Sequence, residues 1–466
     1  MKSYLFYILI KKKGKIVVRL KKYHEKKTKN MYILLFASLS ILLVAGVLFY
    51  KSYAYYEEAK DFDVINGTVE DPGDIYFAYY IDGEISREMP AQNTGYTLDE
   101  TKSNCNNNVT VTWDNASWEA KVNHKNYSAT TNTRTKCTLY FNKTSKTVAT
   151  ALGNLEVNSY TPDFTKSACD DSSCESHEKG IYETTDYDGN PTYYYRGSVE
   201  NNYVKFAGYY WRIIRINSNG SIRMIYDGTI AHTNGEASED RQYGTSQFNS
   251  SYNDNMYVGY MYTSGEAHGT SVSSVIKTNV DKFYTDELVS YASKLDVDAG
   301  FCGDRSSLSL QNGTGVGNLT TYFRGYLRSN QNVPTLKCEN VNDYYTASTS
   351  STGNKSLANS IGLITLDEAI LLGYTGGIFD GAYNLQEKNI DGFLTIGNHF
   401  WTMTPAGFYN PFGGSYIRSI VFCITSHGTI DDADVYNLNF IRPVISIRSD
   451  VNITGNGTID DPFAVN

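Results

Sequence analysis

The stretch from Tyr203 to Tyr226 is the feature that most constrains the fold of this chain. It contains two strand-like runs joined by Asn217-Ser218-Asn219-Gly220, and Gly220 suits a turn position that needs a positive φ. The two-residue period of a strand assigns Trp211 and Ile213 to one face of the first run, and Arg212, Ile214 and Ile216 to the other. The sequence therefore predicts a hairpin at the centre of a β-rich domain.

The composition favours extended structure with many turns. The chain of 466 residues has 40 tyrosines and 38 glycines but only 9 prolines, and 41% of its residues are hydrophobic. Aromatic residues are enriched in strands, whereas glycine supplies turns. A chain of this length can bury more than one core, so we expect several domains.

Residues 31–50 form a run of 20 positions without a charged side chain. At about 1.5 Å per residue, a helix of this length spans about 30 Å, which matches the hydrocarbon core of a bilayer. The sequence therefore predicts a transmembrane helix over 31–50. A cleaved signal peptide is the alternative, with Ser52-Tyr53-Ala54 as its small-residue site, although the apolar run exceeds the usual ~7–15 residues.

Charge is distributed unevenly on the two sides of this run. Residues 1–30 carry 11 lysines and arginines and one glutamate, whereas the rest of the chain has 30 basic and 49 acidic residues. Because basic segments stay in the cytoplasm, we expect a single-pass cell-membrane protein with a basic cytoplasmic tail (1–30) and an extracellular C-terminal ectodomain. The acidic ectodomain argues against a nucleic-acid partner, which needs a basic face.

All seven cysteines follow the predicted transmembrane helix, where disulfides are permitted. The expected pairs are Cys105 with Cys137, Cys302 with Cys338, and Cys169 with Cys174. Cys423 is then expected to be buried and free. Metal binding is the competing use of cysteine, but Cys169-x4-Cys174 has neither the spacing nor the partner residues of a zinc site. We therefore predict disulfides and no metal.

The ectodomain divides into segments of different character. We expect a stalk over 51–73, a small all-β domain over 74–143, a polar connector with little core over 144–180, and a large domain over 181–466. In the small domain, Asp82-Gly83 is a hairpin turn signal after a strand-like run.

The large domain combines strands with short helices. Ser274 is a predicted N-cap of a helix that breaks near Tyr284, and Thr365 with Glu368 forms a predicted capping box. The Asp367-Glu368 pair is interpreted as helix N-terminal charge. A sheet with helices on one side is an α+β arrangement.

Four segments of the large domain resemble a group of membrane-anchored surface proteins of gut-type Gram-positive bacteria. These segments are YWRIIRIN, IGLITLDEAILLG, FWTMTP and FIRPVISI. GGSY followed by NFIRPV is similar to the GGSW and GFR signatures of the formylglycine-generating-enzyme branch of the C-type-lectin-like fold. The resemblance covers residues 181 to about 450 and implies that fold for the large domain.

The departures from that branch bear on activity. Tyr416 stands where the branch has Trp, and Pro443 follows Arg442, so the resemblance implies packing rather than catalysis. Those enzymes use two nearby cysteines, whereas only Cys423 lies between the two motifs. The Glu-Pro-Asn, Gln-Pro-Asp and Trp-Asn-Asp motifs of calcium-dependent lectins do not occur.

Two classes of function remain open. A surface-anchored binding protein, adhesin-like or lectin-like, needs exposed side chains on loops that a rigid scaffold holds. The alternative is an enzyme acting on envelope or other glycans, but HExxH, GxSxG and phosphate-loop motifs are absent. We predict a binding protein without catalytic activity or cofactor, whose partner is a glycan or protein on a host or bacterial surface. The candidate ligand-surface residues are Tyr409, Tyr416, Asp431, Asp432 and Asp434.

Overall fold

The computed structural model describes residues 75–92, 95–114, 116–123, 134–153, 155–168, 179–308, 315–350, 352–376, 378–379, 385–386, 392–411, 413 and 416–465. The chain divides into two compact units, Met1–Gln92 with Tyr96–Asn142 and Asn93–Gly95 with Lys143–Asn466. The predicted tail, transmembrane helix and stalk, and the pair Cys169 and Cys174, lie outside the described residues. In the ranges given above, no helix is long and apolar enough to cross a membrane.

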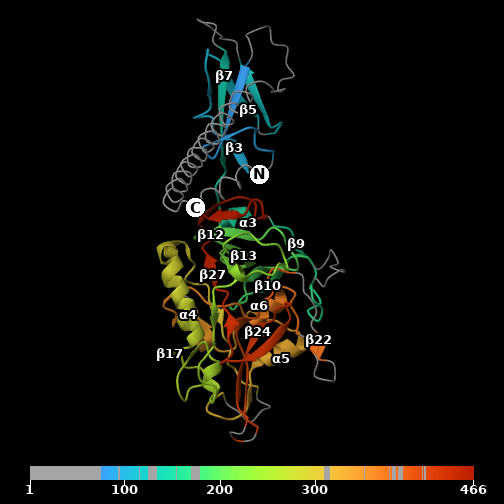
Figure 1. The fold of residues 1–466 in the computed structure, drawn as a ribbon, viewed down its shortest axis with the longest axis vertical. Coiled ribbons are helices and arrows are strands. Elements are labelled where there is room, and N and C mark those ends of the chain that lie inside the picture. The colour runs from blue at the N-terminus through green and yellow to red at the C-terminus, as the bar shows by residue number, and fades with distance from the viewer. Residues whose placement is uncertain are drawn as a thin grey trace, which may run out of the picture. The chain divides into compact units, whose positions relative to one another are not determined.

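The described part of the chain is α+β, mostly strands with few helices (Figure 1). The sheet of the first unit has the order β2-β1-β7-β3, with β4 beside β7, and β5 and β6 form a separate hairpin. The strands are β1 (Ile75–Ile81), β2 (Glu84–Ser86), β3 (Tyr96–Leu98), β4 (Asn104–Cys105), β5 (Thr110–Asp114), β6 (Glu119–Asn123) and β7 (Thr135–Lys143).

The first unit has a small core. Tight turns and a disulfide stabilise this unit. Asp82 and Gly83 turn with φ of 49° and 89° between β1 and β2, so the predicted hairpin is confirmed. Its buried core residues are Tyr79, Leu98, Leu139 and Phe141. The predicted disulfide between Cys105 and Cys137 is also confirmed, and it joins β4 to β7.

The second unit is built on two sheets. The larger sheet contains β8 (Lys146–Thr147), β9 (Val157–Asn158), β10 (Gly180–Thr185), β11 (Pro191–Arg196), β12 (Tyr203–Phe206), β13 (Tyr209–Ile216), β14 (Ile222–Gly228), β27 (Val444–Ile447), β28 (Asn452–Thr454) and β29 (Phe463–Val465). The smaller sheet contains β15 (Thr245–Ser246), β19 (Thr321–Tyr322), β23 (Phe400–Tyr409), β24 (Arg418–Ile424), β25 (Ile430–Asp434) and β26 (Asn439–Phe440). Two-stranded pairs complete the unit: β16 (Met261–Tyr262) with β17 (Val272–Ser273), β18 (Phe301–Cys302) with β20 (Tyr344–Tyr345), and β21 (Ile378–Phe379) with β22 (Leu385–Gln386).

The predicted central hairpin is β13–β14, and Gly220 takes a φ of 79° in its turn. Strict alternation along β13 was the wrong expectation. Met224 pairs with Ile213, but the next residue of β14, Arg223, pairs with Arg215, so the register shifts by one residue at Ile214. This irregularity is a β-bulge, in which one strand carries an extra residue and the side chains beyond it change face.

Strands from the end of the chain complete the larger sheet. β27 pairs with β14, β29 pairs with β12 in parallel, and β28 pairs with β29 and β8. In Figure 1 these red strands lie among the green strands of the second unit. The predicted connector contributes to the same unit, because β8 is followed by α3 (Val148–Leu152), whose buried Val148 and Leu152 enter the core.

The helices of the second unit confirm the predicted caps. α4 (Val275–Phe283) begins after Ser274, whose side chain accepts a hydrogen bond from the backbone of Lys277, and it changes to a π-helical turn at Tyr284. Phe283 packs on Tyr226 of the hairpin, with ring centroids 5.7 Å apart. The remaining helices are α5 (Arg324–Gln331) and α6 (Leu366–Leu371), with short helical turns at Glu239–Arg241, Asn255–Val258, Val289–Lys294 and Val341–Asp343. Thr365 and Glu368 form the capping box of α6.

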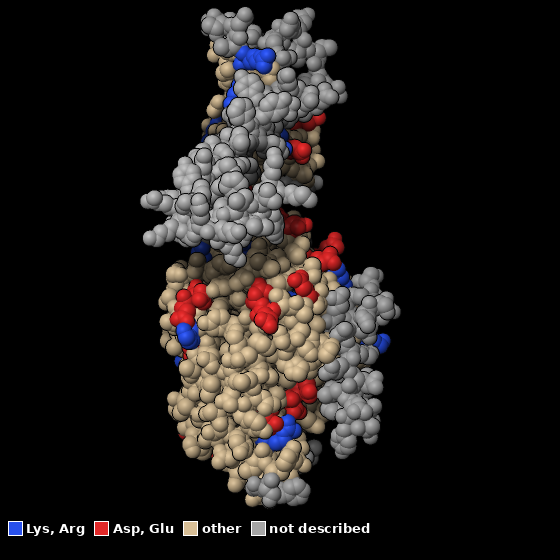
Figure 2. Space-filling view, in the orientation of Figure 1, with Lys and Arg blue, Asp and Glu red and all other residues tan. Residues whose placement is uncertain are grey.

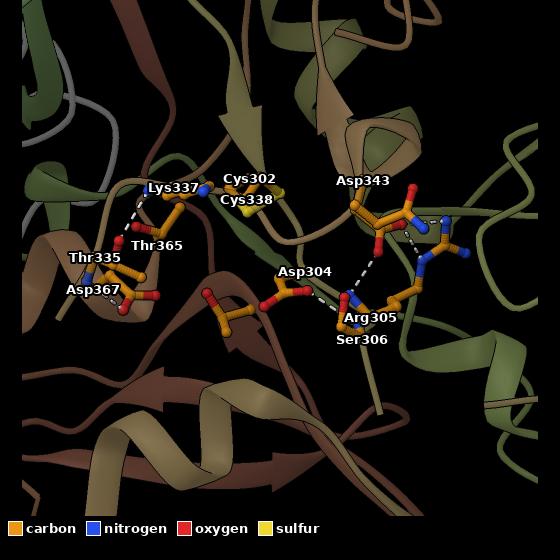
Figure 3. The surroundings of a disulfide bond; sticks show 12 residues. Cys302, Asp304, Arg305, Ser306, Thr335, Lys337, Cys338, Asp343, Thr365 and Asp367 are labelled. Atoms are coloured by element: carbon orange, nitrogen blue, oxygen red, sulfur yellow. Dashed lines mark hydrogen bonds and ion pairs between the residues drawn. A yellow bond between two sulfur atoms is a disulfide. The ribbon is translucent and has the colours of Figure 1, made fainter. Parts of the chain in front are cut away.

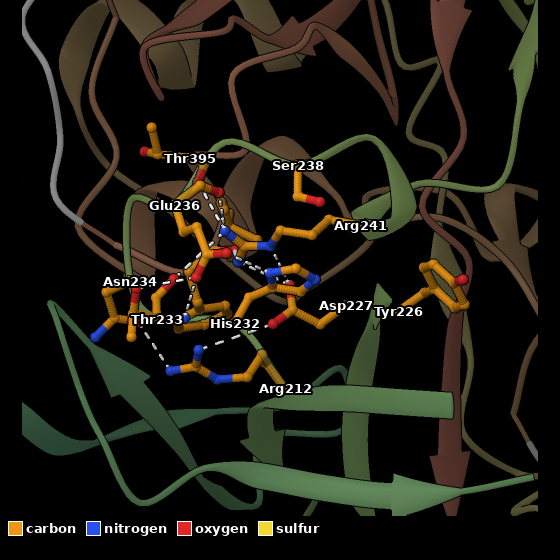
Figure 4. Close-up of polar contacts among 12 residues, drawn as sticks. Arg212, Tyr226, Asp227, His232, Thr233, Asn234, Glu236, Ser238, Arg241 and Thr395 are labelled. Atoms are coloured by element: carbon orange, nitrogen blue, oxygen red, sulfur yellow. Dashed lines mark hydrogen bonds and ion pairs between the residues drawn. The ribbon is translucent and has the colours of Figure 1, made fainter. Parts of the chain in front are cut away.

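The segment that follows β14 contributes a buried arginine to the core. An arginine of this segment, Arg241, contacts the buried carboxylate of Asp227 at 2.8 Å, and Arg442 contacts the same oxygen at 2.7 Å. Arg212 lies 3.8 Å from the other oxygen of Asp227 (Figure 4). These four side chains are fully buried, and burial lowers the pKa of Arg442 to about 9. Arg442 of the NFIRPV motif therefore has a structural role, because it contacts a buried carboxylate of the core.

Candidate functional site

A cavity of about 430 Å³ opens in the second unit where the central hairpin meets α6. Its walls come from the β10–β11 turn, β13 and β14 with their turn, the segment around residue 298, β20 and the start of α6. The lining residues are Asp186, Tyr187, Asp188, Arg215, Asn217, Ser218, Asn219, Arg223, Asp296, Asp298, Ala299, Gly300, Cys302, Thr335, Leu336, Tyr344, Ser350, Thr352, Thr365, Asp367 and Glu368. All of these residues belong to one unit.

Two arginines share one carboxylate at the floor of this cavity. The bulge at Ile214 places Arg215 directly opposite Arg223, so both side chains project from the same face of the hairpin. Nε of Arg223 lies 2.6 Å from Oε1 of Glu368, and Nε of Arg215 lies 3.1 Å from the same atom. Oε2 of Glu368 accepts a hydrogen bond from the backbone of Thr365 at 2.9 Å. The capping box of α6 therefore orients the carboxylate that holds both arginines.

A second ion-pair group lies behind this floor. Arg328 of α5 donates to Asp367 at 2.8 Å and to Asp304 at 2.8 Å. The backbone of Thr335 donates to Asp367 at 3.0 Å (Figure 3). The disulfide between Cys302 and Cys338, which confirms the predicted pair, lies between these contacts and ties two walls of the cavity together.

The mouth of the cavity is acidic, and side chains of the hairpin turn bind two of its aspartates. The hydroxyl of Ser218 donates to Asp186, and the amide of Asn219 donates to Asp296 at 2.9 Å. Asp186 also accepts hydrogen bonds from the backbone of Asp188 and Asn190, both at 2.9 Å, so this Asp-Gly segment forms a side-chain-stabilised turn. The carboxylates of Asp186 and Asp296 are therefore held by local hydrogen bonds.

An aromatic pair forms one wall. The rings of Tyr187 and Tyr344 are parallel, with 4° between their planes and 4.5 Å between their centroids. Gly300 permits this arrangement, because a Cβ at this position would lie 2.3 Å from the ring of Tyr344. The cavity thus combines a flat apolar surface with charged groups.

Burial and neighbouring charges set the ionisation of the floor. Burial lowers the pKa of Arg223 to about 10, although Glu368 opposes this shift. Burial raises the pKa of Glu368, but the attraction of Arg223 and Arg215 outweighs it, so the pKa is lowered overall. Burial raises the pKa of Asp367 despite its contact with Arg328. At neutral pH the carboxylate of Glu368 is therefore held in its charged form by the arginines.

Several polar groups at this site remain available to a ligand. Within the described residues, no hydrogen bond engages Nη2 of Arg215 or the carboxylates of Asp188 and Asp298. Nη2 of Arg223 is buried and also has no hydrogen-bond partner in this part of the chain. No group of three or more His, Cys, Asp or Glu side chains in the described ranges is arranged to hold a metal ion. The cavity can thus both donate and accept hydrogen bonds.

The ligand-surface residues predicted from the sequence lie elsewhere, on the smaller sheet. Tyr409 pairs with Arg418 across β23 and β24, and the rings of Tyr409 and Tyr416 are 6.1 Å apart. Arg418 lies 2.9 Å from Asp434 and 3.7 Å from Asp432. Alternation along β25 places Asp431 on the opposite face from Asp432 and Asp434. Four of the five predicted residues are thus brought together around Arg418, which the sequence analysis did not single out.

Other aromatic residues near the expected surface are scaffold residues. Trp401 is fully buried, and its indole donates to the backbone of Ser246 at 2.8 Å. Tyr209 is half-buried and donates to Glu287 at 2.7 Å. Cys423 is free and buried, as predicted, and burial raises the pKa of its thiol.

The cavity residues were missed because their partners are distant in the sequence. Arg215 and Glu368, for example, are 153 positions apart. A signal was present in the two arginines within strongly apolar strands, because a charged residue in a buried strand requires a partner. The Asp367-Glu368 pair lies in the first turn of α6, as predicted, and both residues are in addition buried and bound to arginines.

Comparison of the chain with protein-family models, curated proteins and solved structures found no match.

Proposed function

We propose that this chain is a membrane-anchored, lectin-like binding protein of the cell surface, and that the cavity of its second unit binds a polyhydroxylated ligand such as a saccharide unit. The observation that carries the proposal is the combination, in one cavity, of a flat aromatic wall with unoccupied charged hydrogen-bond groups.

A sugar ring presents hydroxyl groups around its edge and C–H groups on its faces. Carboxylates such as Asp188 and Asp298 accept hydrogen bonds from hydroxyl donors, and Nη2 of Arg215 donates to a hydroxyl acceptor. Tyr187 and Tyr344 each cover one face of the other ring, so an outer ring face of this pair would contact the C–H face of the ligand. A volume of about 430 Å³ suits a ligand of this size.

The buried carboxylates of the cavity are engaged in ion pairs, because Glu368 is held by two arginines and Asp367 by one. Glycoside hydrolysis needs two carboxyl groups that are free to act as acid and as base or nucleophile. Among the described residues, Asp188 and Asp298 are the free carboxylates of the cavity, so a turnover assay of variants at these two positions distinguishes binding from hydrolysis. The C-type-lectin-like fold and the anchor over residues 31–50 are part of the proposal, and the sequence motifs and the uncharged 20-residue run support them.

The test is to screen the purified full chain on an array of neutral, amino and acidic glycans and to measure hits by calorimetry. Asp298→Asn and Asp188→Asn alter exposed groups of the mouth, and Glu200→Gln is the control at an exposed carboxylate that does not line the cavity. Loss of a hydrogen bond to a charged group costs about 1.5–3 kcal/mol, so we expect affinity to fall about 10- to 100-fold in the cavity variants only.

The outcomes separate the possibilities. Binding that resists both cavity substitutions would place the ligand elsewhere, and the absence of any glycan ligand would overturn the proposal. Release of reducing sugar from a bound glycan would favour the enzymatic alternative. Because the described residues hold no metal-binding group, a chelator is expected to leave the affinity unchanged.

A further inference from the structure

The smaller sheet of the second unit has a tyrosine-rich face that is separate from the cavity. We call Tyr252, Tyr322, Tyr326, Tyr409, Tyr416 and Tyr436, with Arg418 at their centre, the tyrosine face. None of these residues lines the cavity.

Pairing of three strands brings two of these tyrosines to the same part of the sheet. Gly407 of β23 pairs with Tyr322 of β19 on one side and with Ile420 of β24 on the other. Gly407 is buried, and a Cβ at this position would lie 3.5 Å from Tyr322 and 3.6 Å from Ile420. The ring of Tyr322 therefore packs close to the backbone of β23.

The tyrosines form three ring pairs. The ring centroids of Tyr322 and Tyr326 are 5.0 Å apart, and those of Tyr252 and Tyr436 are 5.2 Å apart. Tyr409 and Tyr416 form a third pair beside Arg418. Arg418 connects two of these pairs, because it contacts Asp434, which in turn interacts with Tyr436.

These rings are accessible to solvent. Tyr416 is 53% exposed, Tyr252 44% and Tyr436 40%. On the side of the second unit that Figure 2 shows, uncharged residues cover most of the surface and charged groups are small and separate. Exposed tyrosines with an arginine are the composition of protein-binding surfaces, because a tyrosine ring provides a large contact area at low entropic cost.

We propose that the tyrosine face docks a protein segment that presents lysine or arginine side chains. Asp432 and Asp434 both contact Arg418, so these three side chains together carry an excess of negative charge when both carboxylates are ionised. The exposed ring faces of Tyr416 and Tyr436 attract a cation through their π electrons. A cationic segment thus satisfies both the aromatic and the acidic groups.

Docking of a cation is coupled to the ionisation of Asp432. Burial is the largest effect that raises the pKa of Asp432 to about 6, and the negative charges of Asp431 and Asp434 add to it. The positive charge of Arg418 opposes this shift. Tyr322 and Cys423 also interact electrostatically with Asp432. A bound cation favours the ionised form, so binding releases a proton and becomes weaker as the pH falls through about 6.

The experiment measures binding of the full chain to a labelled, end-capped peptide of alternating lysine and serine by fluorescence anisotropy at pH 7.5 and pH 5. A peptide of alternating glutamate and serine is the charge control. Tyr416→Ser combined with Tyr436→Ser tests the rings, and Asp432→Asn combined with Asp434→Asn tests the carboxylates. Asp450→Asn is the matched control, because Asp450 also holds a surface arginine, Arg448.

We expect the lysine peptide to bind and the glutamate peptide not to bind. Each double variant should weaken binding about tenfold or more, and Asp450→Asn should not. The affinity of the unmodified chain should fall between pH 7.5 and pH 5, whereas Asp432→Asn alone should remove most of this pH dependence. Equal binding by the double variants, or no peptide binding, would overturn the proposal. A mucin glycan that binds instead and is lost in the tyrosine variant would assign the face to carbohydrate and also overturn it.

Discussion

Arg215 and Arg223 meet at one oxygen atom, Oε1 of Glu368, although strict strand alternation would place them on opposite faces of the hairpin. The bulge at Ile214 is the cause, because it rotates Arg215 onto the face of Arg223. One carboxylate thereby compensates two arginines that are almost completely buried.

Replacing Glu368 with Gln should destabilise the second unit strongly. The substitution leaves two buried arginines without a counter-charge, and breaking a buried ion pair costs about 3–5 kcal/mol. Chemical denaturation followed by circular dichroism measures the loss in the free energy of unfolding. Asp450→Asn breaks an exposed pair with Arg448 and should change this free energy little. Equal losses of unfolding free energy in the two variants would show that the ion pairs at the shared oxygen stabilise the chain no more than an exposed pair does.

Asp227 should be equally sensitive. Asp227→Asn keeps the shape of the side chain but removes the charge that faces Arg212, Arg241 and Arg442. We expect a loss of about 3–5 kcal/mol in the free energy of unfolding. Glu200→Gln, at an exposed position beside Lys179, is the control in the same denaturation experiment. A midpoint for Asp227→Asn that stays at the value of the unmodified chain would contradict the role assigned to this carboxylate.

The disulfide of the first unit should matter most to that unit alone. Cys105 and Cys137 are 32 positions apart, and a cross-link of this span contributes about 3–4 kcal/mol in the chain-entropy model. Replacing both cysteines with alanine should make residues 75–142 susceptible to limited proteolysis while the second unit stays resistant. Replacing Cys302 and Cys338 should give the reverse pattern. Protease resistance of the first unit without its disulfide would show that its small apolar core is sufficient.

The stability of the chain should depend on Asp432 in a defined pH range. Its folded-state pKa of about 6 lies above the ordinary value of 3.8, so between these pH values the folded chain binds more protons than the unfolded chain. The ionisation of Asp432 therefore lowers stability as the pH rises from about 4 to about 6, and the penalty is complete at pH 7.

Asp432→Asn removes this penalty. Because the side chain is 30% exposed and partly screened, we expect a gain of about 1 kcal/mol at pH 7 rather than the full value of the shift. The gain should vanish near pH 4, where the carboxyl group is protonated in both states. Thermal unfolding of both proteins at pH 4 and pH 7 tests this, and an equal gain at both pH values would exclude ionisation as its cause.

Features that depend on neighbouring residues were predictable from the sequence. The turns at Asp82-Gly83 and at Gly220 and the caps at Ser274 and Thr365 follow from local backbone chemistry, and the structure confirms them. The disulfides Cys105–Cys137 and Cys302–Cys338 were also predictable, because each pair closes a loop within one unit.

The candidate site was not predictable in the same way. The bulge at Ile214 leaves no distinct pattern in an apolar strand, yet it decides which side chains face the cavity. The partners of Arg215 and Arg328 come from segments far along the chain. Four of the five predicted ligand-surface residues lie together around Arg418, whose position became evident only from the pairing of β23 with β24.

The pairing of β28 with β8, and of β29 with β12, has a consequence for how the protein is made. In the larger sheet, β28 and β29 lie between β8 and β12, so β8 and β12 stay unpaired at these edges until residues 452–465 have been synthesised. Contacts of such long sequence separation form slowly, and unpaired edges attract other strands. Until β28 and β29 are synthesised, the edges of β8 and β12 are unpaired and prone to aggregation, so the folding of this unit would benefit from chaperones.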